Sequence, residues 1–417
     1  MLMLIAVAQA SLCARTFREV ELISGAEDLE RIGMDTTDNW WAITQPFSNQ
    51  YRLIVNGDET ETFEQLADPV FSPNGLFWQT FGIHQNVLQF VSNIGDAYMD
   101  YTSAEPAVFS LDSRCIAFTA YDNDQAWAVR YRIEDHPDGG YKLRELKRTP
   151  IYDKQSKLFV ATDGSKTAYV GRRGDSEVVA IGETEFTVYD KIEAHGFLKD
   201  GSFLYSARLG DLWRLYRDNE AISSSFNSIN NGVFNRDHSM FAFVAVGSVV
   251  SYAVLFQQDK DELEFSEQQE NITALAIHPD LPLTAYKVFN YGAPTVMYGS
   301  ARYSATENTG ALQFSHDGEE LYYLECDVIN CYMNVNGQRY DLSTDIDTGE
   351  PLVVAPGTKT FSFATGLTLV VRSFDGKDVW TGMLVDQVGH ARFNWRQNRY
   401  EALGVINDRL YLLYCGM

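Results

Sequence analysis

The chain has little positive charge. Its 417 residues include 33 Lys+Arg against 57 Asp+Glu, which gives a formal net charge of −24. A surface of this sign repels the phosphate backbone of DNA and RNA, so we exclude nucleic acid as a partner. The apolar fraction of 45% nevertheless places the sequence among globular proteins and not among disordered ones.

The sequence has no continuous apolar run of membrane-spanning length. The apolar run at its start, MLMLIAVAQASLCA, is too short to cross a bilayer as a helix. It is typical of a secretory signal, with Ala8 and Ala10 as small residues for cleavage, although no Lys or Arg precedes Arg15. We therefore expect residues 1–14 to be a signal peptide and the mature chain to be exported to the periplasm, the cell surface or the medium. A buried N-terminal strand is the alternative.

Cysteine is scarce, with five in the whole chain. Cys326 and Cys331 flank Asp-Val-Ile-Asn, a segment that can turn a hairpin. Cross-strand neighbours in a hairpin come within disulfide distance, so a bridge is expected in an oxidising compartment. Two free thiols on strands are the alternative. A zinc site is not indicated, because no second cysteine or histidine pair lies nearby.

Helical periodicity is essentially absent, and a β-type phrase recurs in its place. An apolar pair and a small or polar residue lead into a turn with Asp or Asn, and an alternating strand follows. The turn residues are Asn74, Asp112, Asp163, Asp200, Asp237, Asp280 and Asp317. Successive turn residues are 38, 51, 37, 37, 43 and 37 positions apart. The repeat is therefore one of 37 or 38 residues, with insertions after the second and fifth copies.

Weaker copies of the phrase extend the repeat in both directions. They lie at Met34–Thr37, Phe361–Gly366 and Phe393–Asn398, which brings the count to ten units. Four short strands with tight turns fit one unit of this length, as in a propeller blade. We expect an all-β fold, a β-propeller of eight to ten four-stranded blades formed by residues 15–417. Two smaller propellers are the alternative.

The last unit is one strand short. Phe17–Ile23 alternates apolar and polar residues and precedes the first unit. We expect this segment to supply the missing outer strand and to close the ring, because an added strand covers an exposed sheet edge.

Several phrases resemble a known repeat. Phe71–Gly75 and Phe314–Gly318, together with the strands that begin at Gly210–Trp213 and Lys377–Trp380, resemble the TolB-type and WD-repeat-like β-propeller repeats of bacterial envelope and secreted proteins. The resemblance covers roughly residues 31–417. It implies an architecture and not an activity, because the motif residues build turns and pack between blades.

A catalytic motif is missing. No G-x-S-x-G is present, and the seven histidines are dispersed. His238, His278 and His316 lie in or beside the repeated turn, where we expect structural hydrogen bonding. We name no catalytic or cofactor-binding residue and expect no cofactor. Calcium binding is an alternative at two acidic groups, neither of which has EF-hand spacing. One group is Asp345, Asp347 and Glu350, and the other is Asp122, Asn123 and Asp124.

One basic cluster stands against the acidic background. Lys142, Arg144, Lys147 and Arg148 lie in the insertion that follows the second copy, with Lys154 and Lys157 beyond them. We expect these residues to form a docking patch for an acidic protein or a polysaccharide. A solvated loop without a partner is the alternative.

We expect an exported, non-enzymatic propeller that binds or assembles with proteins or glycans. A propeller enzyme acting on glycans or lactones and a structural subunit of a surface layer or filament are the alternatives.

Overall fold

A computed structural model describes most of the chain. The described residues are 17–23, 28–35, 37–95, 97–123, 125–151, 158–290, 292–327, 330–342, 352–355, 358–365, 367–374, 377–394 and 396–416. The expected signal peptide, residues 1–14, lies outside them. The chain forms two compact units, of which one contains Met1–Thr62 with Tyr303–Met417 and the other contains Phe63–Arg302.

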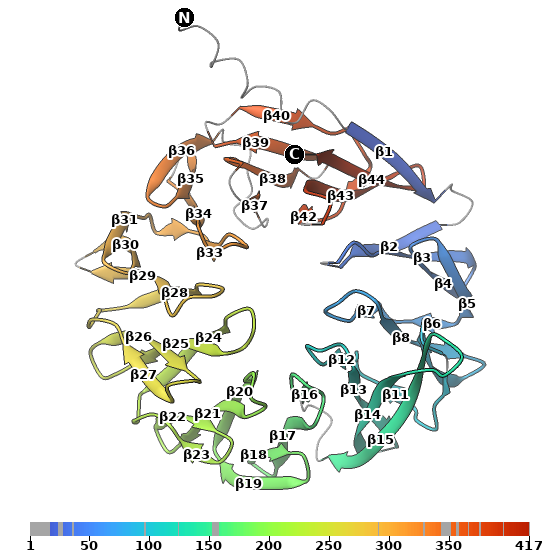
Figure 1. Ribbon diagram of the computed structural model, residues 1–417, viewed down its shortest axis with the longest axis horizontal. Coiled ribbons are helices and arrows are strands. Elements are labelled where there is room, and N and C mark those ends of the chain that lie inside the picture. Colours follow the sequence, from blue (N-terminus) through green and yellow to red (C-terminus); the bar gives the residue numbers. More distant parts are fainter. Residues whose placement is uncertain are drawn as a thin grey trace, which may run out of the picture. The chain divides into compact units, whose positions relative to one another are not determined.

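The unit of residues 63–302 holds six blades, the second to the seventh along the chain. Each is an antiparallel sheet whose strands run outward in chain order (Figure 1). The second and third blades are β6 (Gln65–Leu66), β7 (Val70–Phe71), β8 (Trp78–His84), β9 (Val87–Ser92) and β10 (Ala97–Tyr98), then β11 (Ser103–Ala104), β12 (Val108–Phe109), β13 (Cys115–Asp122), β14 (Gln125–Asp135) and β15 (Tyr141–Ile151). The fourth and fifth are β16 (Leu158–Val160), β17 (Thr167–Arg173), β18 (Ser176–Ile181) and β19 (Thr184–Tyr189), then β20 (Lys191–Phe197), β21 (Phe203–Leu209), β22 (Leu212–Arg217) and β23 (Glu220–Ala221). The sixth and seventh are β24 (Ser228–Phe234), β25 (Met240–Val246), β26 (Ser251–Gln257) and β27 (Glu262–Phe265), then β28 (Ile272–Ile277), β29 (Thr284–Asn290), β30 (Ala293–Tyr298) and β31 (Ala301–Ser304).

The other unit holds the first blade and the last three. The first blade is β2 (Asp28–Met34), β3 (Trp40–Phe47), β4 (Gln50–Val55) and β5 (Asp58–Phe63). The eighth and ninth are β32 (Asn308–Thr309), β33 (Gln313–Phe314), β34 (Leu321–Cys326), β35 (Cys331–Val335) and β36 (Gln338–Leu342), then β37 (Val353–Ala355), β38 (Thr360–Thr365), β39 (Thr368–Ser373) and β40 (Asp378–Thr381). The tenth is β41 (Gln387–Val388), β42 (Arg392–Asn394), β43 (Arg399–Ile406), β44 (Arg409–Gly416) and β1 (Phe17–Ile23).

The all-β prediction is confirmed, and the blade count is ten. The described residues contain no helix. In the tenth blade β1 pairs with β44 from Phe17 opposite Cys415 to Ile23 opposite Leu410. The predicted N-terminal strand is therefore the outer strand of the last blade, and it joins the two ends of the chain in one sheet. That residues 15–417 close into a single ring stays a prediction.

The seven predicted turn residues all lie where the innermost strand of a blade turns into the second. The reason is local: an Asx side chain accepts the N–H of the residue two positions on, which satisfies a backbone donor that the turn leaves unpaired. Asn74 accepts from Leu76 at 3.0 Å and Asp112 from Arg114 at 2.9 Å. Asp163, Asp200, Asp237 and Asp317 repeat the same bond. In the seventh blade His278 accepts the turn N–H groups in place of an Asx residue. Its Nδ1 accepts from the N–H groups of Asp280 and Leu281.

Neighbouring copies of this turn are tied to one another in the unit of residues 63–302. The N–H of Asp112 donates to the carbonyl of Thr162 at 3.0 Å, and the Thr162 hydroxyl donates to the carbonyl of Lys199 at 3.1 Å. The N–H of Lys199 then donates to the carbonyl of His238 at 2.9 Å. The repeat length thus has a structural meaning, because it places each turn beside the turn of the next blade.

The core lies between adjacent blades. Phe81 of the second blade packs edge-on against Phe118 of the third, with ring centroids 4.9 Å apart. Phe241 and Phe243 of the sixth blade pack with Leu204 of the fifth. The strands that meet there are apolar on both faces, as expected for sheets that are covered on both sides.

One weak copy of the phrase is wrong in register. Phe361–Thr365 belongs to β38, the second strand of the ninth blade, and not to the inner turn. The turn from the innermost strand precedes it, between Ala355 and Thr360. The error arises because Phe-Ser-Phe-Ala-Thr-Gly ends in residues typical of a turn, as the inner-turn phrase does, although Phe361–Thr365 lies in the second strand of the blade.

Candidate functional site

The hairpin of β14 and β15 departs most from the repeat within its unit. Both strands have 11 residues, whereas the third strand of each other blade in that unit has six or seven. Its tight turn contains Gly139 and Gly140, whose positive φ values of 94° and 77° suit glycine. The 51-residue gap in the sequence is therefore accounted for mainly by a lengthened outer hairpin (Figure 1).

The two faces of β14 differ in character. Tyr131 and Ile133 pack into the core that the second and third blades share. Arg130, Arg132 and Glu134 alternate with them and so lie on the opposite face of the strand.

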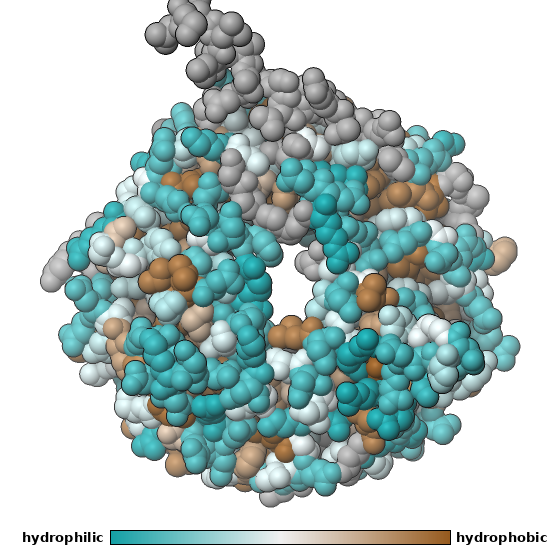
Figure 2. Space-filling model, in the orientation of Figure 1, coloured by the Kyte–Doolittle hydropathy of each residue, from teal (hydrophilic) through white to brown (hydrophobic). Residues whose placement is uncertain are grey.

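The register brings further basic residues onto this second face. Opposite Arg132 and Glu134 the neighbouring strand places Arg144 and Lys142 in turn. We call the surface formed by Arg130, Arg132, Lys142 and Arg144 the basic face. Hydrophilic side chains gather over the third blade on the side of the molecule shown in Figure 2.

Counter-charges cover only part of the basic face. The Glu134 carboxylate lies 2.8 Å from Nε of Arg144 and 3.8 Å from Nζ of Lys142, so that one acid serves two bases. Arg130 donates to the carbonyl of Ser165 in the next blade. Arg132 is exposed, and it has no hydrogen bond or ion pair among the residues that the structure describes. The basic face therefore keeps excess positive charge.

Arg148 differs from the rest of the predicted patch because it is engaged within the hairpin. Its Nε and Nη2 donate to the two carboxylate oxygens of Glu145 at 2.5 and 3.0 Å. These bonds raise the pKa of Arg148 and hold the pKa of Glu145 below its usual range, and the Arg148 guanidinium also lies 5.4 Å from the centroid of Tyr101. Arg148 is thus a structural member of the hairpin.

Of the four predicted patch residues, Lys142 and Arg144 lie on the basic face, and Lys147 takes the register position opposite Arg130. Arg148 lies opposite Val129. Arg130 and Arg132 were not predicted from the sequence, although Val129-Arg130-Tyr131-Arg132-Ile133 alternates as an amphipathic strand does. Lys154 and Lys157 lie outside the described residues.

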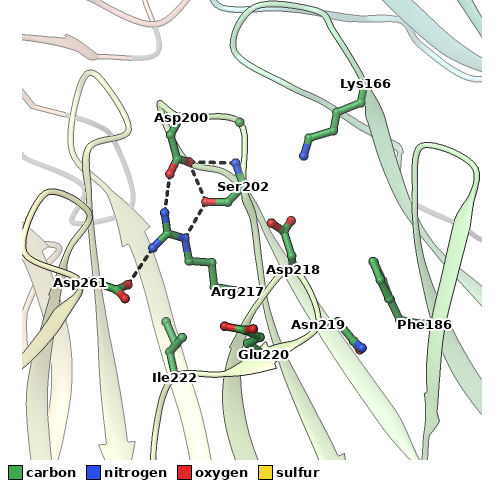
Figure 3. Close-up of a pocket in the computed structure, with 11 residues that line it drawn as sticks. Lys166, Phe186, Asp200, Ser202, Arg217, Asp218, Asn219, Glu220, Ile222 and Asp261 are labelled. Carbon is green, nitrogen blue, oxygen red and sulfur yellow. Dashed lines mark hydrogen bonds and ion pairs between the residues drawn. The ribbon is translucent and has the colours of Figure 1, made fainter.

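A second feature is an open hollow of about 590 Å³ between the turns of the fourth, fifth and sixth blades. Arg217 occupies its centre and donates to Asp200, to Ser202 at 2.9 Å and to Asp261 at 2.7 Å (Figure 3). Asp261 belongs to the turn of the sixth blade, so the guanidinium links two blades. Burial opposes ionisation of Asp200, but the bonds from Ser202 and Arg217 outweigh it and lower the pKa of that carboxyl. One arginine thereby pairs with two of the lining acids.

A serine–histidine pair lies in the fifth blade. Nε2 of His195 is 2.7 Å from Oγ of Ser206. Ser206 is fully buried, and the His195 ring packs 4.7 Å from the ring of Phe241. Burial lowers the pKa of His195 to about 3, so the imidazole is neutral at pH 7. A nucleophile must reach its substrate, and this serine does not. The Ser206 bond orients the imidazole within the fifth blade, and the ring contact with Phe241 packs that blade against the sixth.

The cysteines and the acidic groups are placed as follows. Cys326 and Cys331 are joined by a disulfide across the first residue pair of the β34–β35 hairpin. Asp122 accepts a hydrogen bond from the Asn123 side chain at 2.9 Å, whereas Asp124 and the group at Asp345, Asp347 and Glu350 lie outside the described residues. Within the described part of the chain, no three His, Cys, Asp or Glu side chains are grouped to hold a metal ion.

Comparison with known proteins shows a likeness of fold. No family model matches the chain, and no curated protein matches it in sequence. Dihydro-heme d1 dehydrogenase NirN is similar over 78% of both chains, at 12% identity and a TM-score of 0.37. The Dos1 propeller is similar over 96% of this chain and 94% of its own, at 8% identity and a TM-score of 0.37. TolB from Acinetobacter baumannii is similar over 75% of this chain and 76% of its own, at 11% identity and a TM-score of 0.28. The chain has a β-propeller fold, and no single repeat family is singled out.

In the part of the chain that the structure describes, no helix has the length and apolar character to cross a bilayer.

Proposed function

We propose that this chain is a non-enzymatic binding module that engages an acidic protein through the basic face. One observation carries the proposal. Arg132 and Arg144 lie directly opposite each other on the outer hairpin of a chain whose net charge is −24. Like charges at opposed positions of a sheet destabilise it, so folding alone does not account for the pair. An acidic ligand does, because it supplies the missing counter-charge.

The chemistry of the face fits carboxylates. A guanidinium presents several N–H donors in a plane and binds a carboxylate through two parallel hydrogen bonds. Arg132 has its donors free of other partners in the described residues, and Arg144 shares Glu134 with Lys142. The chain carries a net charge of −24, so an acidic partner is repelled by the molecule as a whole and attracted where basic residues gather.

The experiment measures binding of a glutamate-rich peptide to the purified chain and to Arg132→Glu/Arg144→Glu. The matched control is Lys191→Glu/Arg302→Glu, which makes the same charge change at exposed positions of other blades. We expect the hairpin variant to lose about tenfold or more in affinity, since two attractions become repulsions of about 1 kcal/mol each. The control should stay within about threefold, because distant exposed charges are screened. Equal losses in both variants would falsify the proposal.

We further propose that the module works in an oxidising compartment outside the cytoplasm. The disulfide between Cys326 and Cys331 supports this, because disulfides persist mainly in exported proteins. N-terminal sequencing of the mature chain tests it. A first residue at or near Arg15 supports export, and a chain that begins at Met1 in the cytoplasm contradicts it.

A further inference from the structure

We propose that the partner docks as an extended acidic strand on the free edge of β15, and that it adds a new outermost strand to the third blade. This inference rests on the proposed function and specifies how the basic face is used. β15 is the last strand in the sheet order β11-β13-β14-β15, and no other strand of the described residues pairs with its outer edge. With 11 residues it is also the longest of the outermost strands, the next being β1 with seven.

The direction of the backbone groups can be derived from one hydrogen bond. The N–H of Ile133 donates to the carbonyl of Arg114 at 2.9 Å and so points toward β13. Neighbouring residues of a strand point their backbone groups to opposite sides, so those of Arg132 and Glu134 face β15. Their opposed residues, Arg144 and Lys142, return these bonds.

The groups that remain on the outer edge follow by the same alternation. Tyr141, Leu143 and Glu145 point their N–H and C=O groups away from β14, since they alternate with Lys142 and Arg144. This stretch is regular, because the bulge in the pairing begins only after Glu145. An extended peptide can pair with these three residues as strands do in β-augmentation.

Side-chain placement then specifies the ligand sequence. A residue of the incoming antiparallel strand that lies opposite Lys142 or Arg144 shares their face, with Cβ atoms about 4.5–5.5 Å apart. Acidic residues at these alternate positions meet the basic face. The intervening residues lie opposite Leu143, whose side chain packs against the core of the second and third blades. The preferred ligand therefore alternates acidic and apolar residues.

Two other occupants of this edge are disfavoured. A second copy that paired through its own β15 would bring Lys142 and Arg144 against further basic residues of the same strand. A sulfated or uronic polysaccharide meets the charge of the basic face but lacks the backbone amides that complete a sheet. The edge strand of the first blade differs in charge: β5 carries Asp58, Glu59 and Glu61, which repel an acidic strand.

The decisive experiment compares three blocked peptides of about nine residues in which Glu and Val alternate. The first is unmodified, the second is N-methylated at the Val amides, and the third at the Glu amides. In the predicted register the Val N–H groups point to β15 and the Glu N–H groups point to solvent. Fluorescence anisotropy at about 50 mM NaCl should show that the Val-methylated peptide binds about tenfold or more weakly, and that the Glu-methylated peptide binds within about threefold of the first.

A protein variant gives the reciprocal test. Leu143→Pro removes one outward N–H and no bond to β14, and proline is tolerated at such edge positions. We expect weaker binding of the unmodified peptide. An unchanged circular dichroism spectrum confirms the fold, while the melting temperature falls because the Leu143 packing is lost. Leu143→Val is the control that keeps the N–H.

The outcomes separate this inference from the proposed function. If both methylated peptides bind like the first, while Arg132→Glu/Arg144→Glu abolishes binding, the strand addition is wrong and the charged docking face stands. If heparin binds and no peptide does, the partner is a polysaccharide and both proposals fall. Concentration-dependent dimerisation lost in Leu143→Pro assigns the edge to a second copy and also overturns the inference. Absence of binding to every probe contradicts both proposals.

Discussion

The third and sixth blades are built on the same plan, and they differ at the outer edge. In the sixth blade the outermost strand β27 has four residues, and its Glu264 has two partners: it accepts from Gln257 and lies 3.2 Å from Lys260. In the third blade the outermost strand has 11 residues, and Arg144 lies opposite another arginine. The inner strands are alike in both, with Phe243 and Phe118 fully buried.

This difference shows which parts of a blade the fold requires and which parts can vary. The inner strands and the first turn carry the packing between blades, and there the sequence is held to apolar residues and Asx turns. The outer hairpin touches less of the core, so its length and charge can change without loss of the blade. A feature at the outer edge that disfavours folding is therefore a stronger sign of function than one in the core.

The largest loss of stability should come from substitutions in the apolar core between adjacent blades. Phe243→Ala and Phe118→Ala each remove a fully buried ring, and each should destabilise the chain by about 3–5 kcal/mol through lost burial and the cavity left behind. Denaturant unfolding followed by tryptophan fluorescence measures both. If Phe118→Ala lowered the free energy of unfolding several-fold less than Phe243→Ala, the core of the third blade would be less well packed. The inner strands of the two blades would then not be alike, and the comparison would be wrong.

The next effect depends on pH and tests the packing of the fifth blade on the sixth. Burial lowers the pKa of His195 to about 3, whereas an unfolded histidine titrates near 6.5. Between these values the unfolded chain binds a proton that the folded chain does not, so stability falls as pH falls below about 6.5. The loss from this residue should reach about 3 kcal/mol at pH 4.

His195→Gln isolates this contribution, because glutamine can donate to Ser206 and does not titrate. The difference in unfolding free energy between variant and parent should shift in favour of the variant from pH 7 to pH 4. A difference that is constant over this range would mean that His195 is protonated in the folded chain.

A smaller effect concerns the tie between the fifth and sixth blades at Asp237. Burial acts to raise the pKa of this carboxyl, but hydrogen bonds from Lys199 and Ser239 prevail and lower it. A lowered pKa stabilises the fold above the unfolded value of about 4 and is lost as pH falls through the folded value. Asp237→Asn should therefore cost up to about 1 kcal/mol at pH 7, since the pair is half exposed, and much less near pH 2.

Thermal melting of Asp237→Asn and of Asp259→Asn, at an exposed acid of the sixth blade, measures this pH dependence. The control should melt like the parent at both pH values. If the two variants behave alike, the tie between the turns does not contribute measurably to stability.

Much of the fold was predictable because each turn solves a local problem. An Asx residue at a fixed place after an apolar pair satisfies the N–H two positions on, and this requirement is visible in the sequence at Asn74, Asp112 and Asp163. The insertion after Asp112 was equally visible as a longer gap. The misplacement at Phe361–Thr365 shows the limit: where the Asx residue is missing, the next hairpin carries the stronger turn residues.

The site was predictable only in part, because the basic face depends on strand register. Lys142 and Arg144 were found from their density along the chain, but Arg132 joins them through a pairing that spacing does not reveal. Arg148 looked equivalent in sequence and is engaged instead by Glu145. The clamp of Arg217 on Asp261 joins residues 44 positions apart and had no local signal.

The smallest effect is a gain in stability, and it tests the difference between the outer edges of the third and sixth blades. Arg132→Thr removes one of two opposed like charges and places a residue of high β propensity on β14. We expect the variant to be more stable than the parent by about 0.2–1 kcal/mol, with the gain shrinking at high salt as screening weakens the repulsion. Arg302→Thr, at an exposed position on β31, should leave stability unchanged. The same Arg132→Thr variant should bind the glutamate-rich peptide more weakly, so that stability rises while binding falls. If Arg132→Thr is destabilised to an extent that salt does not alter, the arginine contributes to the blade, and the argument that its charge is kept for a partner is lost.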